Sequence, residues 1–159
     1  MSTTISIVRG RAATAALIVA LLVAVVACSV PVTGASARLH DVTFAFPSSA
    51  VVLERGTSRS AEAAVDSRAR ALSRQHGYQP GGFTTELYSV PAEGAAAIES
   101  DFAIAAVEAG WTPAPELAST GETFQAMGWT HAGGRAIVAG YGKDTASGRA
   151  FVAVLRAAR

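Results

Sequence analysis

The sequence predicts an α+β fold in which two helices pack on one face of a largely antiparallel sheet of four to five strands. Two segments, residues 60–76 and 91–109, carry apolar side chains at the three- and four-residue spacing of a helix. The last third of the chain holds three strand-like segments separated by glycine-containing turns. The order is strand, helix, strand, helix and then three strands, which favours an α+β class.

Two strands are expected before the first helix. Val42, Phe44 and Phe46 alternate with polar or small residues, which is the period of a half-buried strand. Pro47 ends this segment, and a short second strand is expected over residues 51–53.

The first helix is predicted over residues 60–76, with Ser60 as its N-cap and Gly77 as its left-handed stop. Asp66 and Arg70 are four residues apart in the order that stabilises an exposed helix face. The basic residues of this helix are therefore expected on a solvated face rather than in an anion site; they are Arg68, Arg70 and Arg74.

The second helix follows a strand predicted over residues 83–90, which is rich in aromatic and β-branched residues. Pro91 suits the first turn of this helix, where its missing N–H costs nothing. The side chains expected to face the core are Ala95, Ile98, Phe102, Ala105 and Ala109, and those expected to face solvent are Glu99, Asp101 and Glu108. Gly110 should end the helix, with Trp111 packed back on its last turn.

The remaining strands are predicted over residues 122–130, 135–141 and 149–156 as an antiparallel meander. Residues 149–156 are apolar on both faces of the strand. We therefore expect this strand to be central in the sheet or covered on both sides.

The N-terminal segment has the organisation of an export signal. Arg9 and Arg11 form a positive region, and residues 12–27 carry no charge. As a helix these residues would span about 24 Å, which is shorter than the roughly 30 Å of a bilayer core. This length favours a cleaved signal over a permanent membrane span.

The end of the uncharged segment holds the only cysteine of the chain. Val25, Val26 and Ala27 precede Cys28, and this pattern resembles the lipobox of bacterial lipoproteins. The resemblance implies that Cys28 becomes the first residue of the mature protein and carries a diacylglycerol. Two or three acyl chains, such as palmitate, give a stable membrane anchor. The resemblance covers only the first fifth of the chain.

Two alternatives to lipidation stay open. Ordinary signal peptidase could cut after residues 35–37 (ASA), which would give a secreted domain, or the helix could stay uncut. The lipoprotein interpretation divides the chain into a signal peptide at 1–27, a lipidated cysteine and flexible tether at 28–38, and a single α+β domain at 39–159. Its expected location is the extracytoplasmic face of the cell membrane.

Several function classes are disfavoured. The 13 basic residues are nearly balanced by 12 acidic ones, so nucleic acid is not expected as a partner. The sequence contains none of the common hydrolase, phosphate-binding or dinucleotide-binding motifs. Because the one cysteine is assigned to the lipid, there is no thiolate metal site. We expect no cofactor and no metal.

Candidate site residues lie in the C-terminal meander. His131 in one turn and Asp144 in the next could form a hydrolytic pair. Trp129 and Tyr141 could form an aromatic platform if the helices leave their face of the sheet open. The candidate ligand contacts are Trp129, His131 and Tyr141.

These observations favour a non-catalytic binding or accessory domain of the bacterial cell envelope. Its partners would be the membrane, through the lipid anchor, and an envelope protein or a small ligand. The alternative from another class is a small envelope hydrolase that uses His131 and Asp144.

Overall fold

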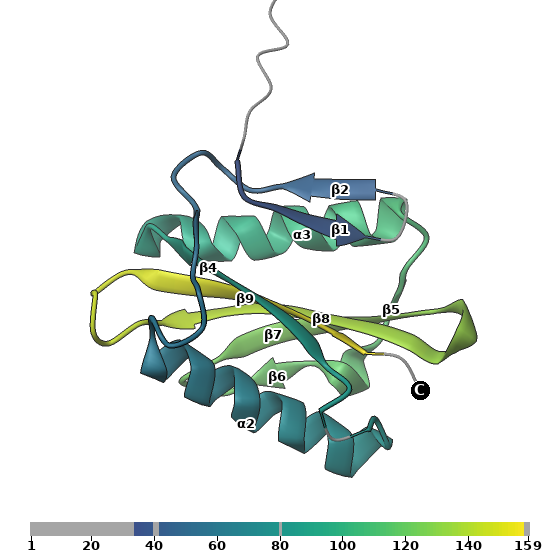
Figure 1. The fold of residues 1–159 in the computed structure, drawn as a ribbon. Coiled ribbons are helices and arrows are strands. Elements are labelled where there is room, and N and C mark those ends of the chain that lie inside the picture. The colour runs from purple at the N-terminus through teal and green to yellow at the C-terminus, as the bar shows by residue number, and fades with distance from the viewer. Residues whose placement is uncertain (1–33, 40–41, 80, 158–159) are drawn as a thin grey trace, which may run out of the picture. The chain divides into compact units, whose positions relative to one another are not determined.

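The computed structural model describes residues 34–39, 42–79 and 81–157. The chain separates into two units, Met1–Thr33 and Gly34–Arg159, and the second contains all the described elements (Figure 1). The predicted signal peptide and Cys28 lie outside the described residues.

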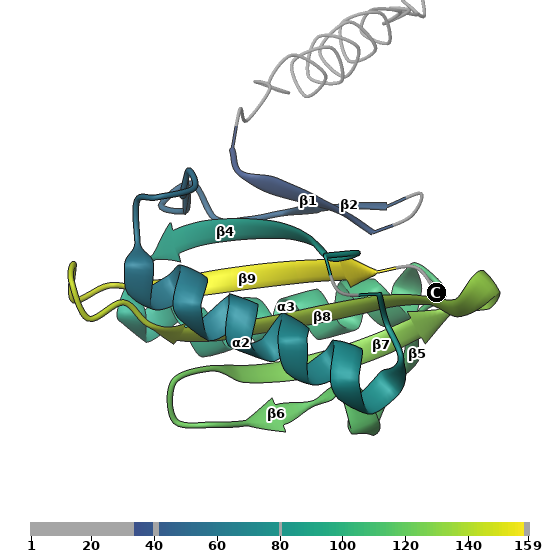
Figure 2. The ribbon, with the colours of Figure 1, turned by 60° about the horizontal axis from the view of Figure 1, so that its bottom comes forward.

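The second unit is built on a seven-stranded antiparallel sheet, so the predicted α+β class is confirmed. Its long strands are β4 (Thr84–Val90), β7 (Gln125–His131), β8 (Arg135–Lys143) and β9 (Ala150–Ala157), and its short strands are β3 (Val51–Val52), β5 (Thr112–Pro113) and β6 (Ser119–Thr120). The order across the sheet is β3-β4-β9-β8-β7-β5, and β6 also pairs with β7. Figure 2 shows β4, β9, β8 and β7 side by side in this order. The sheet exceeds the predicted four to five strands because strands as short as β5 and β6 show no period-two pattern.

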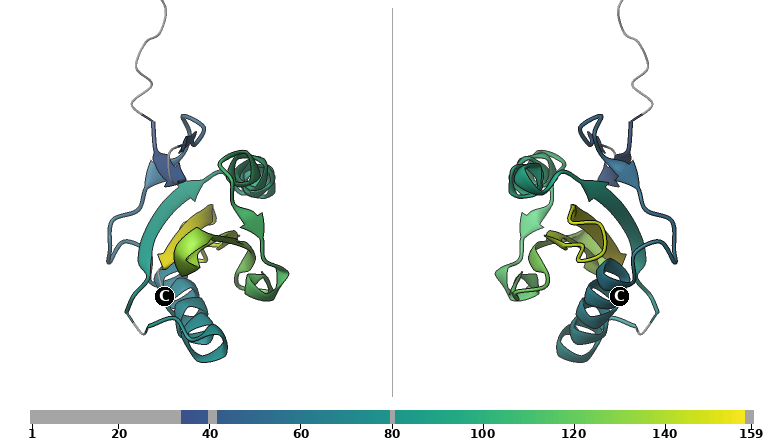
Figure 3. Two further views of the ribbon diagram at one scale, coloured as in Figure 1. Left: turned by 90° about the vertical axis from the view of Figure 1, so that its right-hand side faces the viewer. Right: turned by 90° about the vertical axis from the view of Figure 1, so that its left-hand side faces the viewer.

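The helices α2 (Arg59–His76) and α3 (Ala95–Glu108) lie on opposite faces of the sheet, and not on one face as predicted (Figure 1 and Figure 3). The side chains of β9 alternate between the two faces. Val152 and Val154 belong to the hydrophobic cluster of α3, whereas Phe151, Ala153 and Leu155 belong to the cluster of α2. Both faces of β9 are therefore buried, as its apolar sequence predicts, and one helix is needed for each face.

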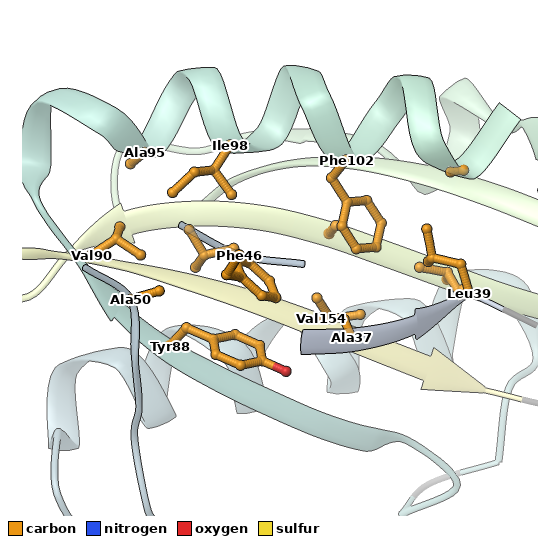
Figure 4. Packing of buried hydrophobic residues seen from close by; sticks show 14 of the residues in the cluster. Ala37, Leu39, Phe46, Ala50, Tyr88, Val90, Ala95, Ile98, Phe102 and Val154 are labelled. Atoms are coloured by element: carbon orange, nitrogen blue, oxygen red, sulfur yellow. The ribbon is translucent and has the colours of Figure 1, made fainter. Parts of the chain in front are cut away.

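A two-stranded hairpin, β1 (Ser36–Leu39) and β2 (Val42–Ala45), covers the same face as α3. Ala37 and Leu39 are fully buried in the α3 cluster. The ring of Phe46 stacks on Tyr88 with centroids 4.0 Å apart (Figure 4). The domain therefore begins before residue 39, and the last residues of the predicted tether form β1.

The ends of both helices follow from their sequences. Ser58, and not Ser60, caps α2, because its Oγ accepts a 3.3 Å hydrogen bond from the N–H of Ala61. Gly77 ends α2 in the left-handed conformation, with φ of 71°. Gly110 ends α3 in the same conformation, as predicted, and the N–H of Trp111 donates to the carbonyl of Ala106 at 3.0 Å.

Glu99 departs from the prediction that it faces solvent. It lies on the inner side of α3 and is only 4% exposed. Its Oε1 has no hydrogen-bond partner within the part of the chain that the structure describes. Loss of hydration in this position raises the pKa of the Glu99 carboxyl group.

We predict that Glu99→Gln increases the free energy of unfolding by roughly 1 kcal/mol at pH 8, because it removes a charge from the core. A carboxyl group with a raised pKa stabilises the fold below its ordinary pKa of 4.5 and destabilises it as the pH rises. The gain should therefore shrink when urea unfolding is repeated at pH 4. A gain of equal size at both pH values would contradict this account, and the exposed Asp101→Asn serves as the control.

Candidate functional site

The predicted hydrolytic pair of His131 and Asp144 does not form. His131 pairs with Arg135, the first residue of β8, whereas Asp144 follows Lys143, the last residue of that strand. The nine residues of β8 separate the two side chains by roughly 30 Å at about 3.3 Å per residue. A hydrolase that uses these residues together is therefore ruled out by the sheet register.

Asp144 has a structural role in the turn between β8 and β9. Its carboxylate accepts hydrogen bonds from Ser147 Oγ at 2.6 Å and from Ser60 Oγ at 2.7 Å. The N–H of Ala146 donates to it as well, at 3.2 Å. Hydrogen bonds from Ser147 and Ser60 lower the pKa of Asp144 to about 2. Because Ser60 lies in the first turn of α2, these contacts attach that helix to the sheet.

We predict that Asp144→Asn lowers the free energy of unfolding by about 1 kcal/mol at pH 6, because the variant loses charge-assisted hydrogen bonds that lower the pKa of Asp144 from 3.8 to about 2 and that solvent partly screens. A lowered carboxyl pKa stabilises the fold above pH 4, and this contribution is lost as the pH falls toward 2. The wild-type protein and the variant should therefore converge in stability between pH 4 and pH 2 in urea titrations. If the difference in unfolding free energy between the two proteins stayed constant from pH 4 to pH 2, the substitution would act through packing and not through the charge of Asp144.

The three predicted ligand contacts do not share an open surface. Trp129 is 2% exposed and packs against Phe102 of α3, with ring centroids 5.8 Å apart. Tyr141 borders the same cluster, and its hydroxyl donates to Gln125 Oε1 at 3.3 Å. His131 lies beside Trp111, and its Nδ1 is 2.9 Å from an Arg135 nitrogen. Helix α3 covers the face on which the aromatic platform was expected.

A different site lies on the opposite face of the sheet. A groove of about 630 Å³ lies between α2, the segment that follows β3, and β4. The wall formed by α2 uses residues spaced three and four apart, and the opposite wall uses alternate residues of β4, so each element presents one side to the groove. The apolar side chains of the groove are Leu53, Val65, Ala69, Phe83 and Leu87.

The rim of the groove carries charged side chains of both signs. The side chains of Arg55, Arg70 and Arg74 make no hydrogen bond or ion pair with any other residue of the described ranges. Glu62 accepts a hydrogen bond from the N–H of Gly56, so this carboxylate is partly engaged. The remaining acidic residue is Asp66, and its predicted pairing with Arg70 is not formed.

Arg68 is not on a solvated face, so the prediction that Arg68, Arg70 and Arg74 are all solvated is wrong for this residue. Its Nη2 donates to the carbonyl oxygens of Leu117 at 2.6 Å and Ala118 at 2.8 Å. Burial lowers the pKa of Arg68 through loss of hydration. This contact joins the middle of α2 to the short helix η2 (Pro115–Leu117).

The outer edge of β4 is incompletely paired beside this groove. Strand β3 pairs with Ser89 and Tyr88, and the N–H of Leu53 donates to the carbonyl of Leu87 at 2.8 Å. Groups two residues apart on a strand point to the same edge, so the N–H and C=O of Thr85 face outward as well. Among the described residues, no partner bonds to these two groups of Thr85.

The groove cannot be recognised in the sequence because it depends on where α2 lies relative to β4. The alternation of Phe83, Thr85 and Leu87 in the sequence marks one face of a strand. It does not show which helix covers that face, or how much of it remains open.

Neither a metal site nor a membrane-spanning helix is present among the described residues. The described ranges contain no group of three or more histidine, cysteine or acidic residues that could hold a metal ion. No helix within them has the length and apolar character needed to cross a membrane. Comparison with protein-family models, with curated proteins and with solved structures yields no match.

Proposed function

We propose that this protein is a lipid-anchored, extracytoplasmic binding module of the bacterial cell envelope, and that its ligand occupies the groove between α2 and β4. The observation that carries the proposal is the combination of an apolar floor with three arginines that have no protein partner in the described ranges. A binding groove of this composition suits an anionic ligand with an apolar part.

The position of β1 supports cleavage at Cys28 over the competing site. Ordinary signal peptidase cleavage after residue 37 would divide β1, whose Ala37 is fully buried in the core. Cleavage before Cys28 leaves the whole hairpin intact. Residues 29–35 would then connect the lipid to β1 and extend at most about 25 Å.

The anchor is tested by the mass of the mature N-terminal peptide from membranes of the native cells. We predict a diacylglycerol adduct on Cys28 and release of the Cys28→Ala variant from the membrane fraction. The exposed Ser36→Ala variant, eight residues further along, should remain membrane-bound. An unmodified N-terminus at Arg38, or an intact Met1, would refute the anchor.

Occupancy of the groove is tested in the same cells by photo-crosslinking. We predict that a benzoylphenylalanine at exposed Thr85 forms an adduct on illumination, because this residue lines the groove. The same residue at exposed Ala96 of α3, outside the groove, is the matched control. Equal labelling at both positions, or none at either, would argue against a ligand site between α2 and β4.

A further inference from the structure

We infer that the ligand of the groove is an extended acidic peptide segment that pairs with the free edge of β4 and continues the line of β3. This inference rests on the proposed function, since it names the ligand class of the same groove. Three features of the described residues support it: an unpaired strand edge, an apolar floor and a spacing of cations that matches an extended chain.

The strand edge favours a peptide over other anions. Thr85 presents one donor and one acceptor at the edge of β4, directly beside the groove. An extended peptide satisfies both groups with main-chain hydrogen bonds, as in other cases of strand addition to a sheet. A fatty acid or a phospholipid could contact the arginines and the floor, but it would leave the N–H of Thr85 without an acceptor of this geometry.

The floor fixes which side chains of the peptide face inward. Alternate side chains of an added strand point to the same face, so every second residue of the peptide lies on the α2 side. Ala69 of α2, together with Leu53 and Phe83, is only partly buried, so these three side chains offer an apolar surface there. An aliphatic residue of the peptide can bury its side chain on this surface.

The arginines account for the acidic character of the peptide. Arg70 and Arg74 are one helical turn apart, which places their β-carbons about 5 to 6 Å from each other. Residues two apart in a strand are separated by about 6.6 Å, so two carboxylates on one face of the peptide match the two guanidinium groups. Arg55 adds a third positive charge to the rim.

The acidic residues of the rim do not cancel the preference of the groove for an acidic peptide. Glu62 is engaged by the N–H of Gly56, and Asp66 is the one other carboxylate that lines the groove. Three guanidinium groups thus face a ligand together with two carboxylates. This balance favours a ligand with two negative charges over one with positive charges.

The test measures binding of a synthetic peptide to the full-length protein in detergent. The probe is a fluorescently labelled seven-residue peptide with blocked ends and the sequence threonine-valine-threonine-glutamate-threonine-glutamate-threonine. Its valine and two glutamates therefore lie on one face of an extended chain. We predict saturable binding by anisotropy at low salt. Replacing both glutamates by lysine should weaken binding at least about tenfold, which corresponds to about 1.4 kcal/mol. A probe whose backbone nitrogens facing β4 are methylated cannot donate hydrogen bonds to the strand, and its affinity should fall by a similar factor.

Protein variants separate the groove from general charge effects. Arg70→Gln and Arg74→Gln should each weaken binding of the probe several-fold, whereas Arg59→Gln, at an exposed position of α2 outside the groove, should leave it unchanged. Neither groove arginine has a partner in the described ranges, so we expect both variants to fold. Bound peptide should also slow amide hydrogen exchange at Thr85, because its N–H gains an acceptor.

The outcomes distinguish this inference from the proposed function. Equal affinity for the methylated and unmethylated probes, or displacement of the acidic probe by the lysine peptide, would overturn strand addition by an acidic peptide. A lipid adduct on the Thr85 crosslinker, without binding of the probe, would also overturn it while retaining the groove as a binding site. A peptide adduct in cells together with binding of the acidic probe supports both.

Discussion

The burial of β9 from both sides is the constraint on which the rest of the structure depends. Seven of its eight residues are buried, and its large side chains alternate between two separate hydrophobic clusters. Each buried aliphatic or aromatic side chain contributes about 1.5 to 3 kcal/mol of transfer free energy, so leaving either face open would be costly. One face is therefore covered by α3 and the β1–β2 hairpin, and the other by α2. The groove exists because α2 covers its face only in part.

Much of the fold can be predicted from local sequence, because its long elements carry strong periodic patterns. Both helices, β4 and the three-stranded meander lie within a few residues of their predicted positions. The opposite placement of the helices was not predicted, although the apolar sequence of β9 already required two covered faces. β1 was missed because a four-residue strand next to a glycine and small polar residues resembles a flexible tether. Its pairing with β2 is recognisable only when the buried positions of Ala37 and Leu39 are known.

Much less of the candidate site could be predicted from sequence. His131 and Asp144 are both next to turns of the meander, but the two turns lie at opposite ends of β8, and only the register shows this. Trp129 is a plausible ligand contact by residue type and is instead part of the core. Arg70 and Arg74 were expected to be solvated, and they are, but their position beside an apolar groove depends on how α2 lies over the sheet. Such sites arise from the distance between two elements, which no local pattern encodes.

The inclusion of residues 36–39 in β1 has a consequence for how strongly the groove must bind. Under the proposed anchor, only residues 29–35 remain between the lipid and β1, so the start of β1 is confined to a layer of about 25 Å beyond the membrane surface. A partner held on the same membrane shares this layer, and confinement by short linkers produces effective concentrations in the millimolar range. A groove with modest intrinsic affinity would then bind a peptide segment that belongs to a membrane-bound partner. The same peptide free in solution, at a lower concentration, would leave most grooves empty. The preference for the membrane-bound peptide over the free one would come from the length of the linker and would need no additional contact in the groove.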